Sequence, residues 1–206
     1  MTETTYPSTH LSHRRADMYI HIIGRILISI MGGAIIFNAL GNLKSPLIIA
    51  VTVYIICVLA SNLASCAYHF SPLHKRRVLL RRIDHAAIYS SITGTFTPFF
   101  VQANTTWTIT LLWVCWALSL LAIWNKITNE TVKSRWSTLS YFGLGAIGLS
   151  AIPDLKGVPT ETLWCIIAGS LSYAIGAIFY SRKLMPYRYA IWHIWVNIGV
   201  IVKSGV

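Results

Sequence analysis

Seven apolar stretches, each close to the length that crosses a lipid bilayer, run through this chain with short polar segments between them. They cover residues 19–41, 46–68, 84–103, 106–124, 137–153, 160–180 and 189–204. A transmembrane helix needs about 20 predominantly apolar residues, because the hydrocarbon core of a bilayer is about 30 Å thick. The sequence therefore predicts an all-α membrane protein, a bundle of seven transmembrane helices.

Composition leads to the same fold class. Apolar residues make up 55% of the chain and charged residues 11%, and the mean hydropathy is +0.60. Such a composition is typical of a protein whose surface faces lipid. Among the 206 residues, we expect 1–18 to form a polar N-terminal tail and 19–206 to form the seven-transmembrane domain, which leaves no room for a separate soluble domain.

Basic residues predict the orientation of the bundle, because lysine and arginine collect in the cytoplasmic loops of membrane proteins. With a cytoplasmic N-terminus, fourteen of the seventeen Lys and Arg residues lie on the cytoplasmic side. Only Lys44, Lys156 and Lys203 lie on the other side. This distribution predicts both a cytoplasmic N-terminus and an odd number of spans.

The charge distribution also limits the expected partners. The net charge of +11 belongs to cytoplasmic loops, where membrane lipids with anionic headgroups are the natural neighbours. A nucleic-acid partner would need a basic face on a soluble module, and none is predicted here. The predicted outer loops are only a few residues long, so we expect no soluble protein partner. The sequence predicts no oligomeric state.

Ionisable side chains at membrane depth are the first candidates for function, because they are costly in lipid and usually face a protein interior. Asp17 and His21 lie at the start of the first predicted helix, and His69 lies at the end of the second. Asp84 begins the third, and His193 lies about one turn into the seventh. In the predicted topology all of them lie toward the cytoplasmic ends of the helices, where they can form one layer.

Several polar residues of this layer are spaced four apart and therefore share a helix face. The pairs are Asp17 and His21, Ser65 and His69, and Tyr189 and His193. Imidazoles, a carboxylate and a hydroxyl from several helices are typical of a zinc site or an acid–base pocket. A structural interpretation stays open: histidines at helix ends cap carbonyls or contact lipid phosphates, and Asp84 can pair with Arg81 or Arg82.

Three segments resemble the hemolysin III family, the bacterial branch of the progestin and adipoQ receptors. Residues 61–99 read SNLASCAYHFSPLHKRRVLLRRIDHAAIYSSITGTFTPF and are similar to its Ser-x3-His, basic loop, Leu-Asp-His and Gly-Thr-Tyr-Thr-Pro-Phe series. ADMYIHIIG resembles its first-helix Asn-x3-His motif, and PYRYAIWHIWV resembles its seventh-helix motif. The segments span most of the chain, in the family's order and at similar spacing.

The resemblance implies a bacterial inner-membrane protein with an adiponectin-receptor-like bundle. Adiponectin receptors and the more distant alkaline ceramidases are proposed membrane-embedded, metal-dependent hydrolases, in which one second-helix His and two seventh-helix His residues hold zinc. Carried over by position, His69 and His193 would be zinc ligands. Asp84 and Ser65 would be the catalytic groups that surround the ion.

Two positions depart from the family pattern. Tyr189 replaces the other seventh-helix His, and Asp17 stands where the family commonly has Asn. A zinc ion normally takes three protein ligands, so the alternatives are Asp84 as a direct ligand, a Tyr189 phenolate, a weak site or no metal. Asp17 places a second acid near the site, where it could favour a cation or equally pair with Arg14 or Arg25.

The resemblance implies hydrolysis of an amide or ester in a lipid, with zinc and Asp84 activating water. The alternative is a non-enzymatic membrane protein, either a lytic, pore-like hemolysin or a regulator of membrane lipid state. A pore needs polar residues through the full depth of the bilayer. The ionisable residues of this chain lie in the cytoplasmic half, which favours a one-sided pocket.

Overall fold

The structure, a computed structural model, describes residues 6–129 and 134–204. These residues form seven α-helices and two short 3₁₀ helices, with no strand in the described ranges. The α-helices are α1 (Leu11–Asn42), α2 (Ser45–Phe70), α3 (Arg77–Ala103), α4 (Thr106–Thr128), α5 (Ser134–Leu149), α6 (Thr160–Ser181) and α7 (Arg188–Ser204). The 3₁₀ helices are η1 (His74–Arg76) and η2 (Ile152–Asp154).

Four of the described helices, α1, α2, α4 and α6, are long and apolar enough to cross a membrane. The fold is therefore that of a helical membrane protein. With 16 and 17 residues, α5 and α7 are shorter than the usual span of about 20 residues. The seven-span topology and the orientation stay predictions.

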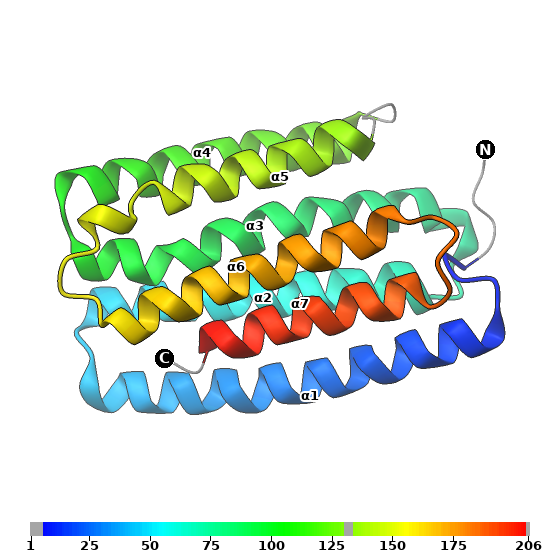
Figure 1. The fold of residues 1–206 in the computed structure, drawn as a ribbon, viewed down its shortest axis with the longest axis horizontal. Coiled ribbons are helices and arrows are strands. Elements are labelled where there is room, and N and C mark those ends of the chain that lie inside the picture. Colours follow the sequence, from blue (N-terminus) through cyan, green and yellow to red (C-terminus); the bar gives the residue numbers. More distant parts are fainter. Residues whose placement is uncertain (1–5, 130–133, 205–206) are drawn as a thin grey trace.

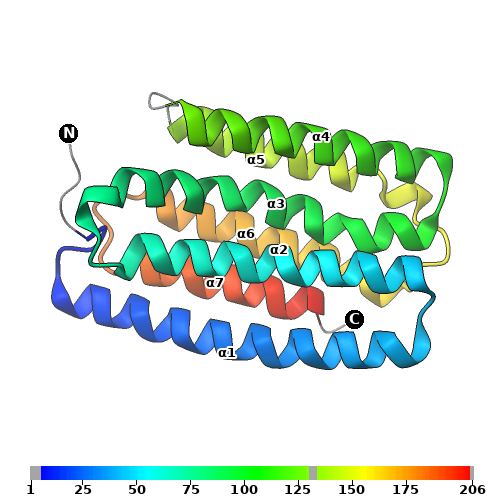
Figure 2. The same ribbon diagram turned by 180° about the vertical axis from the view of Figure 1, so that it is seen from behind.

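The helices run alternately up and down the bundle (Figures 1 and 2). The odd-numbered helices begin at the end where the chain's N-terminus lies, and the even-numbered helices finish there. In the bundle, α7 packs against α1 and α6, α2 against α1 and α3, and α3 against α4 and α5. This alternation brings the start of α1, the end of α2 and the starts of α3 and α7 to one end of the molecule.

The tight connections have local causes. Pro46 lies in the first turn of α2, where its missing N–H costs no hydrogen bond. Asn104 closes α3 in the left-handed conformation, with φ 48°, which asparagine tolerates better than most residues. Thr105 and Thr108 then form a reciprocal capping box at the start of α4. The turn between α3 and α4 is thus set by neighbouring residues.

Apolar side chains lie both inside and outside the bundle. Ile28, Tyr54 and Val200 join α1, α2 and α7 in one buried cluster. Phe100 and Leu111 join α3 and α4 in another. Many large apolar side chains point outward, among them Phe37, Trp113 and Leu121, which are 82%, 71% and 67% exposed. So many exposed, large apolar side chains are expected on a surface that faces lipid.

Several helices have other bounds than the predicted membrane spans. Helix α1 begins at Leu11, within the 1–18 segment predicted as a tail, and α3 begins at Arg77 instead of residue 84. Hydropathy marks only the lipid-crossing part of a helix, whereas backbone hydrogen bonds continue through polar turns. Helix α5 ends at Leu149 and not at 153, because Pro153 follows and cannot donate a backbone hydrogen bond.

Candidate metal centre

A group of polar side chains is buried at the end of the bundle where the N-terminus lies. Asp17 and His21 come from the second and third turns of α1, Ser65 and His69 from the last turns of α2, and His193 from the second turn of α7. Each is at most 9% exposed. Helix α2 packs antiparallel to α1 and α7 packs parallel to it, so the start of α1, the end of α2 and the start of α7 lie together.

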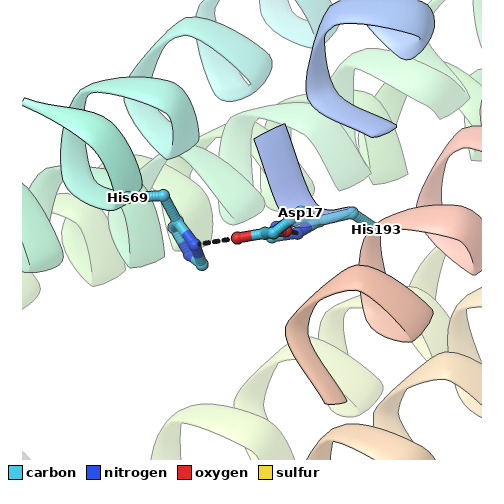
Figure 3. Close-up of side chains that lie close together, drawn as sticks. All are labelled: Asp17, His69 and His193. Carbon is cyan, nitrogen blue, oxygen red and sulfur yellow. Dashed lines mark hydrogen bonds and ion pairs between the residues drawn. The ribbon is translucent and has the colours of Figure 1, made fainter. Parts of the chain in front are cut away.

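The Asp17 carboxylate lies between two histidines (Figure 3). Its Oδ2 atom is 2.6 Å from Nδ1 of His69, and its Oδ1 atom is 2.7 Å from Nδ1 of His193. Both distances correspond to charge-assisted hydrogen bonds. The ligand atoms of the three residues lie within 4.8 Å of one another, so this buried cluster could hold a metal ion.

His21 and Ser65 lie against this cluster. The Nδ1 atom of His21 is 2.9 Å from the backbone carbonyl of Asp17, one turn earlier in α1. The Ser65 hydroxyl lies 3.2 Å from Nε2 of His21 and 3.2 Å from Nε2 of His193. Ser65 therefore connects rings from α1 and α7 on the side away from the carboxylate.

Asp84 and Tyr189 occupy different positions around the same histidines. The half-buried Asp84 carboxyl lies close enough to Ser65 and His69 to interact with both electrostatically. The Tyr189 ring packs edge-on against His69, with ring centroids 5.1 Å apart. Its hydroxyl accepts a hydrogen bond from Nη2 of Arg188 at 2.7 Å. The geometry thus places Asp17, and not Asp84 or the Tyr189 oxygen, between His69 and His193.

The comparisons with known proteins agree with the sequence motifs. The family model described as "Haemolysin-III related" matches residues 10–204. This chain belongs to the hemolysin III family. It is 31% identical over 185 residues to "Hemolysin-3" of Bacillus cereus, an alignment that covers 88% of this chain and 84% of that protein. It is 32% identical over 184 residues to "Hemolysin-3 homolog" of Bacillus subtilis (strain 168), covering 88% and 86%.

Membership of the hemolysin III family confirms the resemblance drawn from the three motif segments. Together with the four helices of transmembrane length, it identifies a multi-pass membrane protein with bacterial relatives. A protein of this class contacts membrane lipids through its outward apolar surface.

Sequence reasoning placed Asp17 only near the site, whereas the structure places it at the centre. The structural reason lies at Gly24, two turns further along α1. A Cβ atom built on Gly24 would lie 2.3 Å from the Asn197 side chain, so α1 and α7 approach closely there. Asn197 also donates to the carbonyl of Ile20 at 3.2 Å. These contacts hold Asp17 and His193 on facing sides of the two helices.

Arg77 is a second residue that sequence reasoning missed. This guanidinium is fully buried at the start of α3. It donates to the carbonyl of Tyr68 and, at 2.7 Å, to that of Ser71. Because α2 ends at Phe70, Arg77 satisfies carbonyls that the helix end leaves free. It thereby fixes the turn that carries His69.

The cluster fits zinc in its donor chemistry. Two imidazole nitrogens and one carboxylate oxygen, with a fourth position open, are the ligand set of many catalytic zinc sites. With zinc–ligand bonds of about 2.0 Å, tetrahedral neighbours lie about 3.3 Å apart. The observed contacts, 2.6 Å to Oδ2 and 2.7 Å to Oδ1 of Asp17, are shorter than this spacing by about 0.6–0.7 Å, so the carboxylate and the two rings would move apart to admit the ion. Each Nδ1 would then lend a lone pair instead of a proton.

Proposed function

We propose that this protein is a zinc-dependent hydrolase of the bacterial inner membrane that cleaves an amide or ester bond in a lipid. The observation that carries the proposal is the buried cluster of Asp17, His69 and His193, contributed by three helices. Ionisable groups at membrane depth are expensive, and they are usually retained for function.

The topology belongs to the same proposal. All seven helices cross the membrane in an adiponectin-receptor-like bundle, with the N-terminus and segment 1–18 on the cytoplasmic side and 19–206 forming the domain. Two observations support this topology. The helices alternate in direction, and with a cytoplasmic N-terminus fourteen of the seventeen Lys and Arg residues lie on the cytoplasmic side. The metal cluster then lies near the cytoplasmic face.

His69, His193 and Asp17 would hold the ion. Asp17 takes the place of the seventh-helix His that is Tyr189 in this chain, so the two departures from the family pattern compensate each other. When bound there, zinc supplies Lewis-acid activation of water and of the scissile carbonyl.

The remaining polar residues have separate roles. Asp84, which faces Ser65 and His69, accepts a proton from the attacking water at its carboxylate oxygen and passes it to the leaving oxygen or nitrogen. Ser65 orients the ring of His193 through the 3.2 Å contact with Nε2. His21 fixes the Asp17 turn through its bond to the Asp17 carbonyl. A site among lipid-facing helices favours an amphiphilic substrate that enters from the bilayer.

Elemental mass spectrometry of the detergent-purified protein tests the proposal. We expect about one zinc per chain in the wild type and loss of zinc in His69→Ala and His193→Ala, because structural and catalytic sites bind the ion stoichiometrically. His10→Ala is the matched control, since His10 is exposed and outside the cluster. Absence of stoichiometric zinc after supplementation would overturn the hydrolase and leave the non-enzymatic alternative, a lytic protein or a regulator of membrane lipid state.

A further inference from the structure

Arg188, the first residue of α7, is held by two aromatic rings beside the metal cluster. Its Cζ atom lies 4.6 Å from the ring centre of Tyr189 and 5.5 Å from that of Tyr180. The two tyrosine rings also touch, with centroids 5.8 Å apart. Cation–π contacts of this kind fix the plane of a guanidinium without neutralising its charge.

Arg188 reaches the metal cluster through a single residue. Its Nη2 atom donates to the Tyr189 hydroxyl at 2.7 Å, and the Tyr189 ring packs against the His69 ring with centroids 5.1 Å apart. A group bound to the guanidinium would therefore lie next to any group bound at His69.

The charge of Arg188 has no carboxylate partner among the described residues. Asp17, the acid of the cluster, pairs with His21, His69 and His193. A guanidinium has five N–H donors, and in the described ranges the Tyr189 hydroxyl is the one hydrogen-bond acceptor recorded for Arg188. A half-buried cation with free donors is best complemented by an anion with several oxygens, and arginine binds phosphate in a bidentate manner.

We propose that Arg188 binds the phosphate of a glycerophospholipid and thereby places an acyl ester of that lipid at the Asp17–His69–His193 cluster. This inference rests on the proposed hydrolase and names its substrate class. Arg188 precedes His193 by five residues, which is about 7–8 Å along a helix at 1.5 Å per residue. Arg188 thus lies nearer the end of the bundle, where headgroups bind basic pockets, and the ester carbonyl lies deeper, as it does in a bilayer.

The reaction would be a simple hydrolysis. The water oxygen bonds to the acyl carbon, the bond between that carbon and the glycerol oxygen breaks, and the glycerol oxygen receives the proton that the water lost. The products are a fatty acid and a lysophospholipid, and no oxidant or reductant is needed. A ceramide or a diacylglycerol carries no phosphate, so it would gain nothing from Arg188.

The test is a binding measurement on the full-length protein in neutral detergent, with zinc content determined on the same sample. The probes are an ether-linked alkylglycerol phosphate and the same alkylglycerol without phosphate, neither of which can be hydrolysed. Tryptophan fluorescence gives both dissociation constants. The variants are Arg188→Gln, Arg188→Lys and Arg182→Gln, of which the last removes an exposed arginine at the C-cap of α6.

We expect Arg188→Gln to weaken binding of the phosphate probe at least about 10-fold, because a charge-assisted bidentate pair is lost, and to leave binding of the neutral probe unchanged. Arg188→Lys should recover only part of the preference, since lysine lacks the planar fork. Arg182→Gln should bind both probes with the dissociation constants of the wild type.

The outcomes separate this inference from the proposed function. Equal affinities of wild type and Arg188→Gln for the phosphate probe, in zinc-loaded protein, overturn the role of Arg188 and leave the hydrolase standing. If the wild type carries no zinc but binds the phosphate probe, and Arg188→Gln binds it more weakly, the phosphate site is supported while the hydrolase fails. If Arg188→Gln does not fold, Arg188→Lys decides: an unchanged preference for the phosphate probe overturns the inference, and a reduced preference supports it.

Discussion

Asp17 accepts a hydrogen bond from His193 across 176 sequence positions, with 2.7 Å between Oδ1 and Nδ1. The contact joins the second turn of α1 to the second turn of α7, so it exists only when the first and last helices of the bundle have packed together. Any ion held there binds the folded chain and not the unfolded one. Metal binding and stability of the bundle are therefore linked.

Asp17→Asn should abolish stoichiometric zinc binding. Loss of a residue that merely supports a ligand lowers metal affinity about 10- to 100-fold. Because Asp17 is proposed as a direct ligand, we expect its loss to lower zinc affinity by at least about 100-fold. Chelator competition on purified protein measures the change. Glu161→Gln, which removes an exposed acid at the start of α6, should bind as the wild type does. Wild-type affinity in Asp17→Asn would exclude Asp17 as a ligand.

Tyr189→His should restore zinc binding in the Asp17→Asn background. The double variant carries the Asn and the second seventh-helix His of the family pattern, so an imidazole replaces the lost carboxylate. Tyr189→Phe should keep the wild-type zinc content, because the Tyr189 hydroxyl bonds to Arg188. Chelator competition measures the zinc affinity of the double variant and of Tyr189→Phe. A Tyr189→Phe variant without zinc would instead favour a phenolate ligand. A double variant no better than Asp17→Asn would argue against compensation.

Much of this arrangement could be predicted from the sequence. Apolar stretches of transmembrane length gave the helices, and the i, i+4 pairs placed Ser65 with His69 and Asp17 with His21 on shared faces. Their common end followed from the alternation of short-linked helices. Family membership, predicted from motifs, is confirmed by the family model.

What the sequence could not give was the rotation of each helix about its axis. That rotation decides which acid faces His69, and it depends on packing between distant segments. Gly24 lets α1 approach Asn197 of α7, and this approach turns Asp17 toward His193. Spacing along one helix carries no information on such a contact, so the sequence favoured Asp84 as the acidic ligand and placed Asp17 only near the site.

Gly148→Ala should destabilise the bundle without affecting zinc. A Cβ atom at Gly148 would lie 2.1 Å from the Phe96 ring, whereas one at Gly143 would have nothing within 4 Å. Overpacking of a buried position costs about 1–3 kcal/mol. Thermal unfolding in detergent should show a lowered midpoint temperature for Gly148→Ala and an unchanged midpoint for Gly143→Ala. Both variants should keep the wild-type zinc content. An unchanged midpoint for Gly148→Ala would mean that α3 and α5 pack less closely than described.

The two ends of α6 should lie on opposite sides of the membrane. Lys156 and Lys183 are exposed, one before α6 and one after it, and α6 is among the helices that can cross the bilayer. In a variant without its four native cysteines, Lys156→Cys should react with a membrane-impermeant maleimide on intact spheroplasts, and Lys183→Cys should react only after permeabilisation. This is the pattern required when α6 is the sixth crossing of a chain with a cytoplasmic N-terminus. Reaction of Lys183→Cys alone on intact spheroplasts would reverse the orientation and move the metal cluster to the outer face, where an outer-leaflet lipid would be the substrate.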